Sequence, residues 1–124
     1  MALLPRDPKS YFFLGNALHK TGSVDEAMRN YQSAIEFDAD FAKAHYNRGV
    51  VLQQLSRIDE ATYHYQEAVR VNPRYAMAHN NLGICLATRG EFDEAAVHFR
   101  EALRLQPDSQ PTRDNLKRVE SQLQ

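Results

Sequence analysis

The sequence contains no tryptophan, a single cysteine and no apolar run approaching the roughly 20 residues that a membrane-spanning helix needs. With Cys85 alone, no disulfide can form within the chain, so we expect a reducing, cytoplasmic compartment. The N-terminal segment MALLPRDPK lacks the basic and long apolar regions of a signal peptide. A net charge of −1 gives no general attraction to nucleic acid or anionic lipid. We therefore expect no nucleic-acid partner and no membrane insertion.

Motifs for catalysis are also missing. The chain has no glycine-rich phosphate loop, no His-Glu-x-x-His motif and no serine-centred elbow. Its 124 residues, 43% hydrophobic and 25% charged, suffice for one folded domain with a modest core. These features predict a small globular protein that is not an enzyme and uses no cofactor or metal.

What the sequence does contain is an internal repeat with a period of about 34 residues, which is typical of stacked helical arrays. Small residues, an aromatic residue and a proline recur in register. The matching sets are Gly15, Gly49 and Gly83; Leu18, Leu52 and Leu86; Ala27, Ala61 and Ala95; Tyr31, Tyr65 and Phe99; Ala34, Ala68 and Ala102; and Pro73 and Pro107.

Each repeat reads as two helices separated by a turn. We expect one pair in residues 8–41, and further pairs at 42–55 with 58–71 and at 76–89 with 92–105. The predicted units are residues 8–41, 42–75 and 76–109, followed by a capping helix in 110–124 that covers the last repeat. Residues 1–7 resemble the tail of a truncated upstream repeat, because Pro5 lies one full period before Ala39 and two before Pro73.

These residues resemble the tetratricopeptide repeat, whose signature places Leu-Gly, Ala, an aromatic residue and Pro at fixed offsets within each copy. The last copy reads Leu82-Gly83, Ala95, Phe99 and Pro107, with His79 in the position of the signature tryptophan. The resemblance implies an all-α, right-handed α-solenoid. It also implies a module for protein–protein interaction that binds an extended peptide in a concave groove lined by the first helix of each repeat.

Placing the inward positions of that groove on this sequence gives the expected binding residues. They are Lys9, Phe12, Phe13, Asn16, Lys43, Tyr46, Asn47, Val50, Asn80, Asn81 and Asn115.

Asparagine recurs at one of these positions, in Asn47, Asn81 and Asn115. This row is similar to the asparagine ladder in the repeats of O-linked N-acetylglucosamine transferases, which implies contact with a peptide backbone through amide donors and acceptors. The first repeat departs from the row, with Phe13 in that place. The alternative interpretation is that these amides only bond neighbouring helices.

A second groove chemistry, the carboxylate clamp of co-chaperones for acidic chaperone tails, matches only at Asn16 and Asn47. The positions of its cationic residues hold Phe12, Met77 and Asn81, none of which can make a charge-assisted bond to a carboxylate. This clamp is therefore disfavoured.

The remaining alternatives concern assembly and histidine. The chain could instead be a spacer in a longer array, or a homo-oligomer that self-associates through its uncapped N-terminal end. His45 and His79 are expected to pack in the core, and His64 and His98 to lie on the outer face. Copies one repeat apart lie too far apart to share a metal ion.

Overall fold

The computed structural model describes residues 7–124, and within that range every regular element is an α-helix. This confirms the predicted all-α fold class. Residues 1–6 lie outside the described range, so the prediction for an upstream tail in 1–7 falls there. The helices are α1 (Pro8–Lys20), α2 (Val24–Phe37), α3 (Ala42–Gln54), α4 (Ile58–Val71), α5 (Ala76–Thr88), α6 (Phe92–Leu105) and α7 (Gln110–Gln122).

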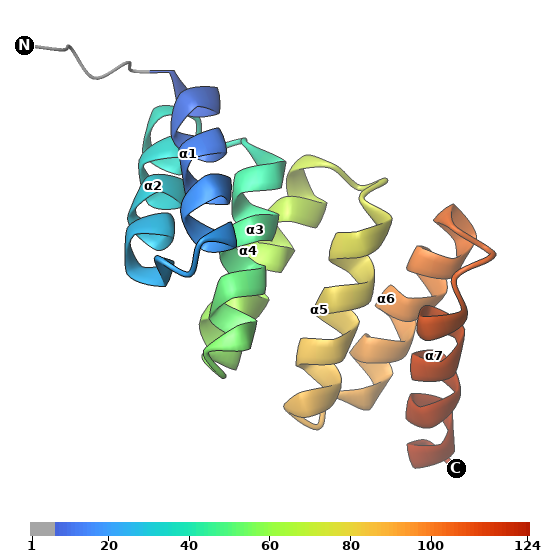
Figure 1. Ribbon diagram of the computed structural model, residues 1–124. Helices are drawn as coiled ribbons and strands as arrows, with labels where there is room; N and C mark the ends of the chain where they lie inside the picture. The colour runs from blue at the N-terminus through green and yellow to red at the C-terminus, as the bar shows by residue number, and fades with distance from the viewer. Residues whose placement is uncertain (1–6) are drawn as a thin grey trace, which may run out of the picture.

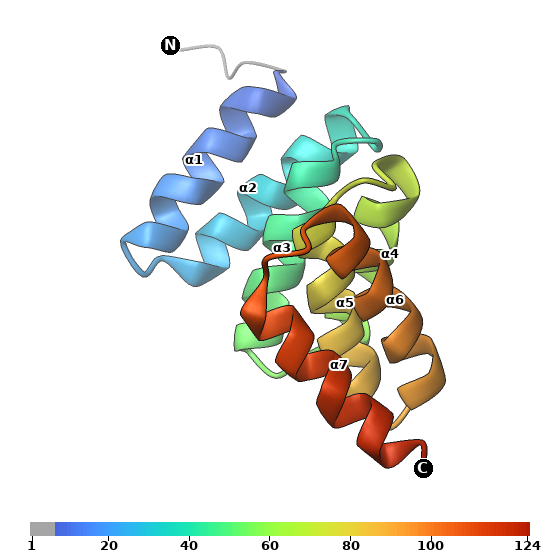
Figure 2. The ribbon, with the colours of Figure 1, turned by 90° about the vertical axis from the view of Figure 1, so that its right-hand side faces the viewer.

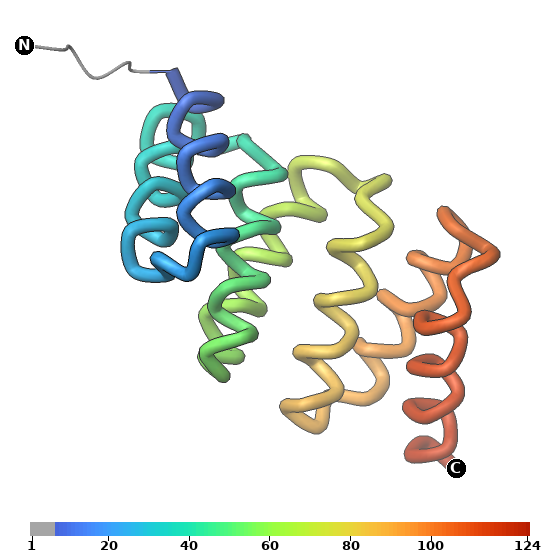
Figure 3. Tube along the Cα trace, in the orientation of Figure 1, coloured from blue at the N-terminus to red at the C-terminus, as the bar shows by residue number. Residues whose placement is uncertain are grey.

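The helices form an open, layered array in which each helix packs on the next one along the chain (Figure 1). Turned by 90°, the array shows α2, α4 and α6 on one side of α1, α3 and α5 (Figure 2). The tube in Figure 3 shows the same succession from the N-terminal pair to α7. The first helices of the pairs therefore form one layer and the second helices the other. No helix in residues 7–124 has the length and apolar character needed to cross a bilayer.

Local chemistry explains where the helices begin and end. Asp7 caps α1 by accepting a hydrogen bond from the Lys9 backbone at 3.0 Å, and Pro8 follows at the first helical position. Gly22 and Gly90 end the first helices of the first and third pairs with φ of +88° and +81°, a region that suits glycine. Ser56 adopts the same region at φ 60° in the second pair.

A glycine faces an aromatic ring inside every pair, and this contact sets the distance between the two helices. A Cβ atom placed on Gly15, Gly49 or Gly83 would lie 2.6–2.8 Å from the facing ring. The rings belong to Tyr31, Tyr65 and Phe99. Because real Cβ contacts are longer than this, only glycine permits the observed approach, as the repeating pattern predicts.

Candidate peptide-binding groove

Aromatic residues dominate the N-terminal end of the first-helix layer. The side chain of Phe12 is only 8% exposed and packs between Phe41 and Tyr31, with ring centroids 5.0 and 6.1 Å away. Its neighbour Phe13 is 64% exposed. Lys9 and Lys43 are exposed nearby on α1 and α3. The structure thus leaves Phe13 as the aromatic surface of this end and places Phe12 in the core.

Phe12 is one of the expected binding residues, but its side chain is buried in the core. A polar residue in place of Phe12 would remove a core side chain, so it would destabilise the fold as well as alter the groove. Phe13 is the better position for testing binding without disturbing the fold.

An asparagine network joins α1 and α3. The Asn16 Oδ1 atom accepts hydrogen bonds from the Tyr31 hydroxyl at 2.6 Å and from Asn47 Nδ2 at 2.7 Å. These residues, with Val50, line a hollow of about 280 Å³ that also borders His19 and Lys20. The polar groups of Asn16 and Asn47 therefore hold two first helices together at the wall of a hollow.

A similar network joins α3, α4 and α5. Asn81 Nδ2 donates to the hydroxyls of Tyr46 and Tyr65 at 3.2 and 3.3 Å. Burial raises the pKa of Tyr65, so its hydroxyl stays protonated and donates to Gln53 at 2.7 Å. Tyr46, Asn80 and Asn81 border a second hollow of about 140 Å³.

The last member of the row, Asn115, donates from Nδ2 to Asn80 Oδ1 at 3.3 Å across α7 and α5. Asn47, Asn81 and Asn115 thus share one arrangement, in which the amide nitrogen reaches back to the preceding first helix. This is the bonding expected if the row ties neighbouring helices together. All three side chains are partly buried, and peptide contact stays a prediction.

The histidines form pairs that the repeat pattern did not predict. His64 is 8% exposed and its Nδ1 lies 3.1 Å from Nδ1 of His45, so the predicted outer-face position is wrong. His98 is half-buried and its Nδ1 lies 3.0 Å from Nδ1 of His79. The two partners are 19 positions apart in both pairs. The sequence comparison aligned only residues 34 positions apart, so it could not reveal this pairing.

The tautomers follow from the backbone contacts. His45 Nε2 is 2.9 Å from the Ala39 carbonyl, which can only accept, so this nitrogen carries the proton and His64 Nδ1 donates to His45 Nδ1. Burial, the charge of Arg48 and the proximity of His45 lower the pKa of His64 to about 4. Within residues 7–124, no three metal-ligating side chains come together. Each pair therefore links the two helices of its repeat.

Charge is divided between the two helix layers. Helices α1, α3 and α5 carry four lysine or arginine side chains and no carboxylate. Helices α2, α4 and α6 carry nine carboxylates and four arginines. A net charge near zero thus conceals a cationic first-helix layer and an acidic second-helix layer.

Paired helices stacked in an open array define a helical-repeat scaffold, an α-solenoid. The sequence matches the family model described as tetratricopeptide repeat over residues 46–110, and a TPR repeat model over residues 15–56. The chain belongs to the tetratricopeptide repeat family. This repeat is an interaction module, and neither matching family model describes an enzyme.

Solved structures of similar fold include the TPR domain of Arabidopsis OM64, with a TM-score of 0.86 and 23% identity over 93% of this chain and 95% of that one. The first TPR of Spaghetti (RPAP3), bound to the HSP90 peptide SRMEEVD, has a TM-score of 0.89 and 21% identity over 98% and 96%. MamA has a TM-score of 0.78 and 25% identity over 82% of this chain and 60% of that one. No curated protein gives a significant sequence match.

Proposed function

We propose that the first-helix layer binds an extended segment of a partner protein along α1, α3, α5 and α7. One observation carries the proposal. The first-helix layer combines an exposed aromatic side chain, Phe13, with lysine and arginine side chains, and helices α1, α3 and α5 contain no carboxylate. Hollows between these helices provide space for side chains of such a segment. The peptide-bound RPAP3 domain, which has the same fold, supports this mode of use.

The roles within the groove follow from exposure. Phe13 supplies apolar contact at the N-terminal end, and Lys9 and Lys43 accommodate acidic residues beside it. Asn47 and Asn81 already donate to neighbouring helices, and Asn81 Oδ1 also accepts from Asn80 Nδ2 at 3.4 Å. The remaining acceptor capacity of their amide oxygens is what they offer to the backbone N–H groups of a peptide. We also propose that the protein acts in a reducing, cytoplasmic compartment, as its single cysteine predicts.

A peptide array tests the proposal. Wild-type protein and the Phe13→Ser variant are screened against the same peptides, together with Tyr63→Ser as a control that removes an exposed aromatic ring from α4 in the other layer. We expect the Phe13→Ser variant to lose bound peptides while the Tyr63→Ser variant keeps them. Identical profiles for all three proteins, or no binding by the wild type, would reject the groove.

The Asn47→Ala, Asn81→Ala double variant tests the asparagine row. Because these amides also link helices, its thermal unfolding must be measured beside its binding. A loss of peptide binding larger than the loss in folded fraction supports direct contact. A loss that follows the folded fraction alone would assign the row to helix packing.

The second candidate function is self-association through α1. Leu14 is 51% exposed, and Ala17 is exposed one turn later. The equivalent positions in α5, Leu82 and Cys85, are buried. Sedimentation velocity over a hundredfold range of concentration tests this candidate. A concentration-dependent dimer that the Leu14→Glu variant abolishes would support self-association, and a monomer throughout would exclude it.

A further inference from the structure

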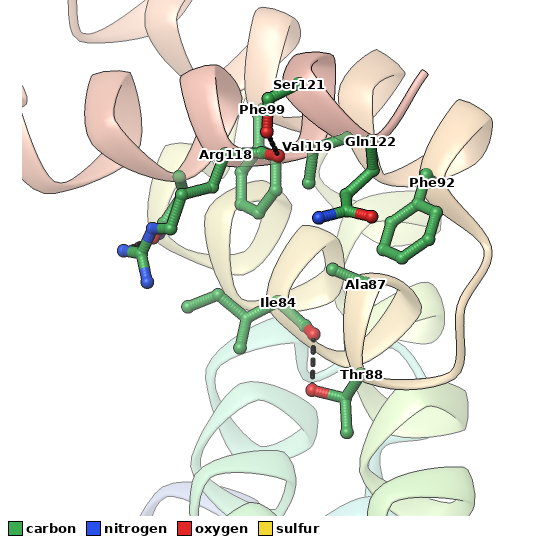
Figure 4. Close-up of a pocket in the computed structure, with 10 residues that line it drawn as sticks. Ile84, Ala87, Thr88, Phe92, Phe99, Arg118, Val119, Ser121 and Gln122 are labelled. Atoms are coloured by element: carbon green, nitrogen blue, oxygen red, sulfur yellow. Dashed lines mark hydrogen bonds between the residues drawn. The ribbon is translucent and has the colours of Figure 1, made fainter. Parts of the chain in front are cut away.

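A cleft with a mainly apolar surface opens between α5, α6 and α7, at the C-terminal end of the groove (Figure 4). Thr88, Ser121 and Gln122 are among its polar lining residues. Its volume is about 480 Å³, within the range of about 300–1,000 Å³ typical of ligand pockets. Phe99 and Val119 lie at its buried floor, and Ile84, Ala87 and Phe92 form half-buried walls. Asn115, one of the expected binding residues, borders it. Helix α7 packs mainly on α6 and only lightly on α5.

A cationic side chain, Arg118, lies at the rim of this cleft. Arg118 is exposed, and its guanidinium donates to Asn115 Oδ1 at 2.8 Å. Within residues 7–124 no carboxylate forms an ion pair with it. On its own helix Glu120 pairs with Arg100, and Asp114, which accepts from the neutral amide of Gln110, forms no ion pair with Arg118. Helix α5 opposite has no acidic residue. Arg118 therefore keeps donors available for an acidic group from outside.

We propose that the cleft anchors an apolar side chain of the partner segment, and that a carboxylate adjacent to this side chain in the partner pairs with Arg118. The inference rests on the proposed function of the first-helix layer and specifies one subsite of it. The occupant is an aliphatic or aromatic residue next to Asp or Glu. The cleft favours an apolar side chain, and Arg118 favours a negatively charged residue next to it in the partner segment.

Three capped peptides provide the probes: Ser-Glu-Leu-Glu-Leu-Glu-Ser, the same peptide with Lys for every Glu, and the same peptide with Ser for every Leu. Each is titrated to millimolar concentration into isotopically labelled protein, and amide shifts are followed by NMR. We expect the acidic leucine peptide to shift Ala87, Thr88 and Val119. The lysine peptide should bind about fivefold more weakly, as expected for loss of an exposed ion pair. The serine peptide should leave the cleft unperturbed.

A charge swap makes the test independent of any general effect on the fold. In the Arg118→Glu variant the lysine peptide should bind at least as well as the acidic one, which reverses the wild-type order. The control variant Arg29→Glu changes the charge by the same amount at an exposed position on α2 and should keep the wild-type order.

The outcomes separate this proposal from the proposed function. Shifts confined to α1 and α3, with no change in order for Arg118→Glu, would overturn the cleft subsite and leave the groove in place. Shifts at the cleft that are equal for all three peptides would also overturn it. If these peptides shift no amide while array-selected peptides shift α1 and α3, the subsite fails alone. If no peptide of either kind binds, both fail.

Discussion

Replacing Gly49 with alanine should destabilise the fold even though alanine is the better helix former. The added Cβ would lie 2.8 Å from Cε1 and 2.9 Å from Cδ1 of Tyr65, well inside normal contact distance. The ring cannot move aside freely, because the buried hydroxyl donates to Gln53 at 2.7 Å and accepts from Asn81 at 3.3 Å. The variant therefore sets overpacking directly against helix propensity.

The magnitudes decide which effect wins. Overpacking a core costs about 1–3 kcal/mol, and exchanging glycine for alanine inside a helix recovers about 1 kcal/mol. Because the ring is fully buried and its hydroxyl makes two hydrogen bonds, we place the cost in the upper half of its range. The expected net loss in unfolding free energy is about 1–2 kcal/mol, or about 3–10 °C in melting temperature for a domain of this size.

Urea and thermal unfolding followed by far-UV circular dichroism measure this loss. The Ala17→Gly variant, at an exposed site in α1, calibrates the propensity difference in the same protein. Adding Tyr65→Leu to the Gly49→Ala background should cost about 1 kcal/mol less than adding it to the wild type, because the clash is then relieved. A Gly49→Ala protein as stable as the wild type, without this coupling, would refute the packing argument.

Three further predictions follow from local features. The Ser56→Gly variant should raise the unfolding free energy by about 0.5–1 kcal/mol in urea titrations, because serine is strained at φ 60°; an unchanged midpoint would contradict this. Since the pKa of His64 falls from 6.5 to about 4 on folding, the unfolded chain binds a proton that the folded chain excludes. Stability should therefore fall by about 3 kcal/mol as the pH drops from 6.5 toward 4, and a His64→Asn variant should show a flatter pH profile. Burial raises the pKa of Cys85 to about 11, so a thiol reagent should label it quickly only in denaturant; rapid native labelling would place the thiol at the surface.

The helices could be predicted because their signals recur in every repeat. The ends expected near residues 55 and 89 lie one residue earlier, at Gln54 and Thr88. The break after α2 needed no proline, since α2 ends at Phe37 with Ala39 in the turn. Periodicity identifies equivalent positions, and the packing of equivalent positions is shared.

The candidate site was harder to predict, because its properties depend on contacts between different positions of the repeat. Phe12 is buried because Phe41 and Tyr31 pack against it. Assigning Phe12 to an inward-facing position of the repeat gives no information about these neighbours. The pairing of His45 with His64 joins two different positions of one repeat. The cleft beside Arg118 depends on how α7 packs on α6 and α5, and the repeat pattern alone does not specify that packing.

The short reach of the contacts has a consequence for how the protein comes apart. Among residues 7–124, side-chain hydrogen bonds connect positions at most 35 residues apart, so none ties one end of the array to the other. Loss of a terminal pair therefore breaks only its contacts with the adjacent pair. Hydrogen exchange should then slow gradually from α1 toward the middle of the chain. A whole repeat unit could be added or removed without creating any contact of a new kind, so the length of the groove can be changed independently of its cross-section.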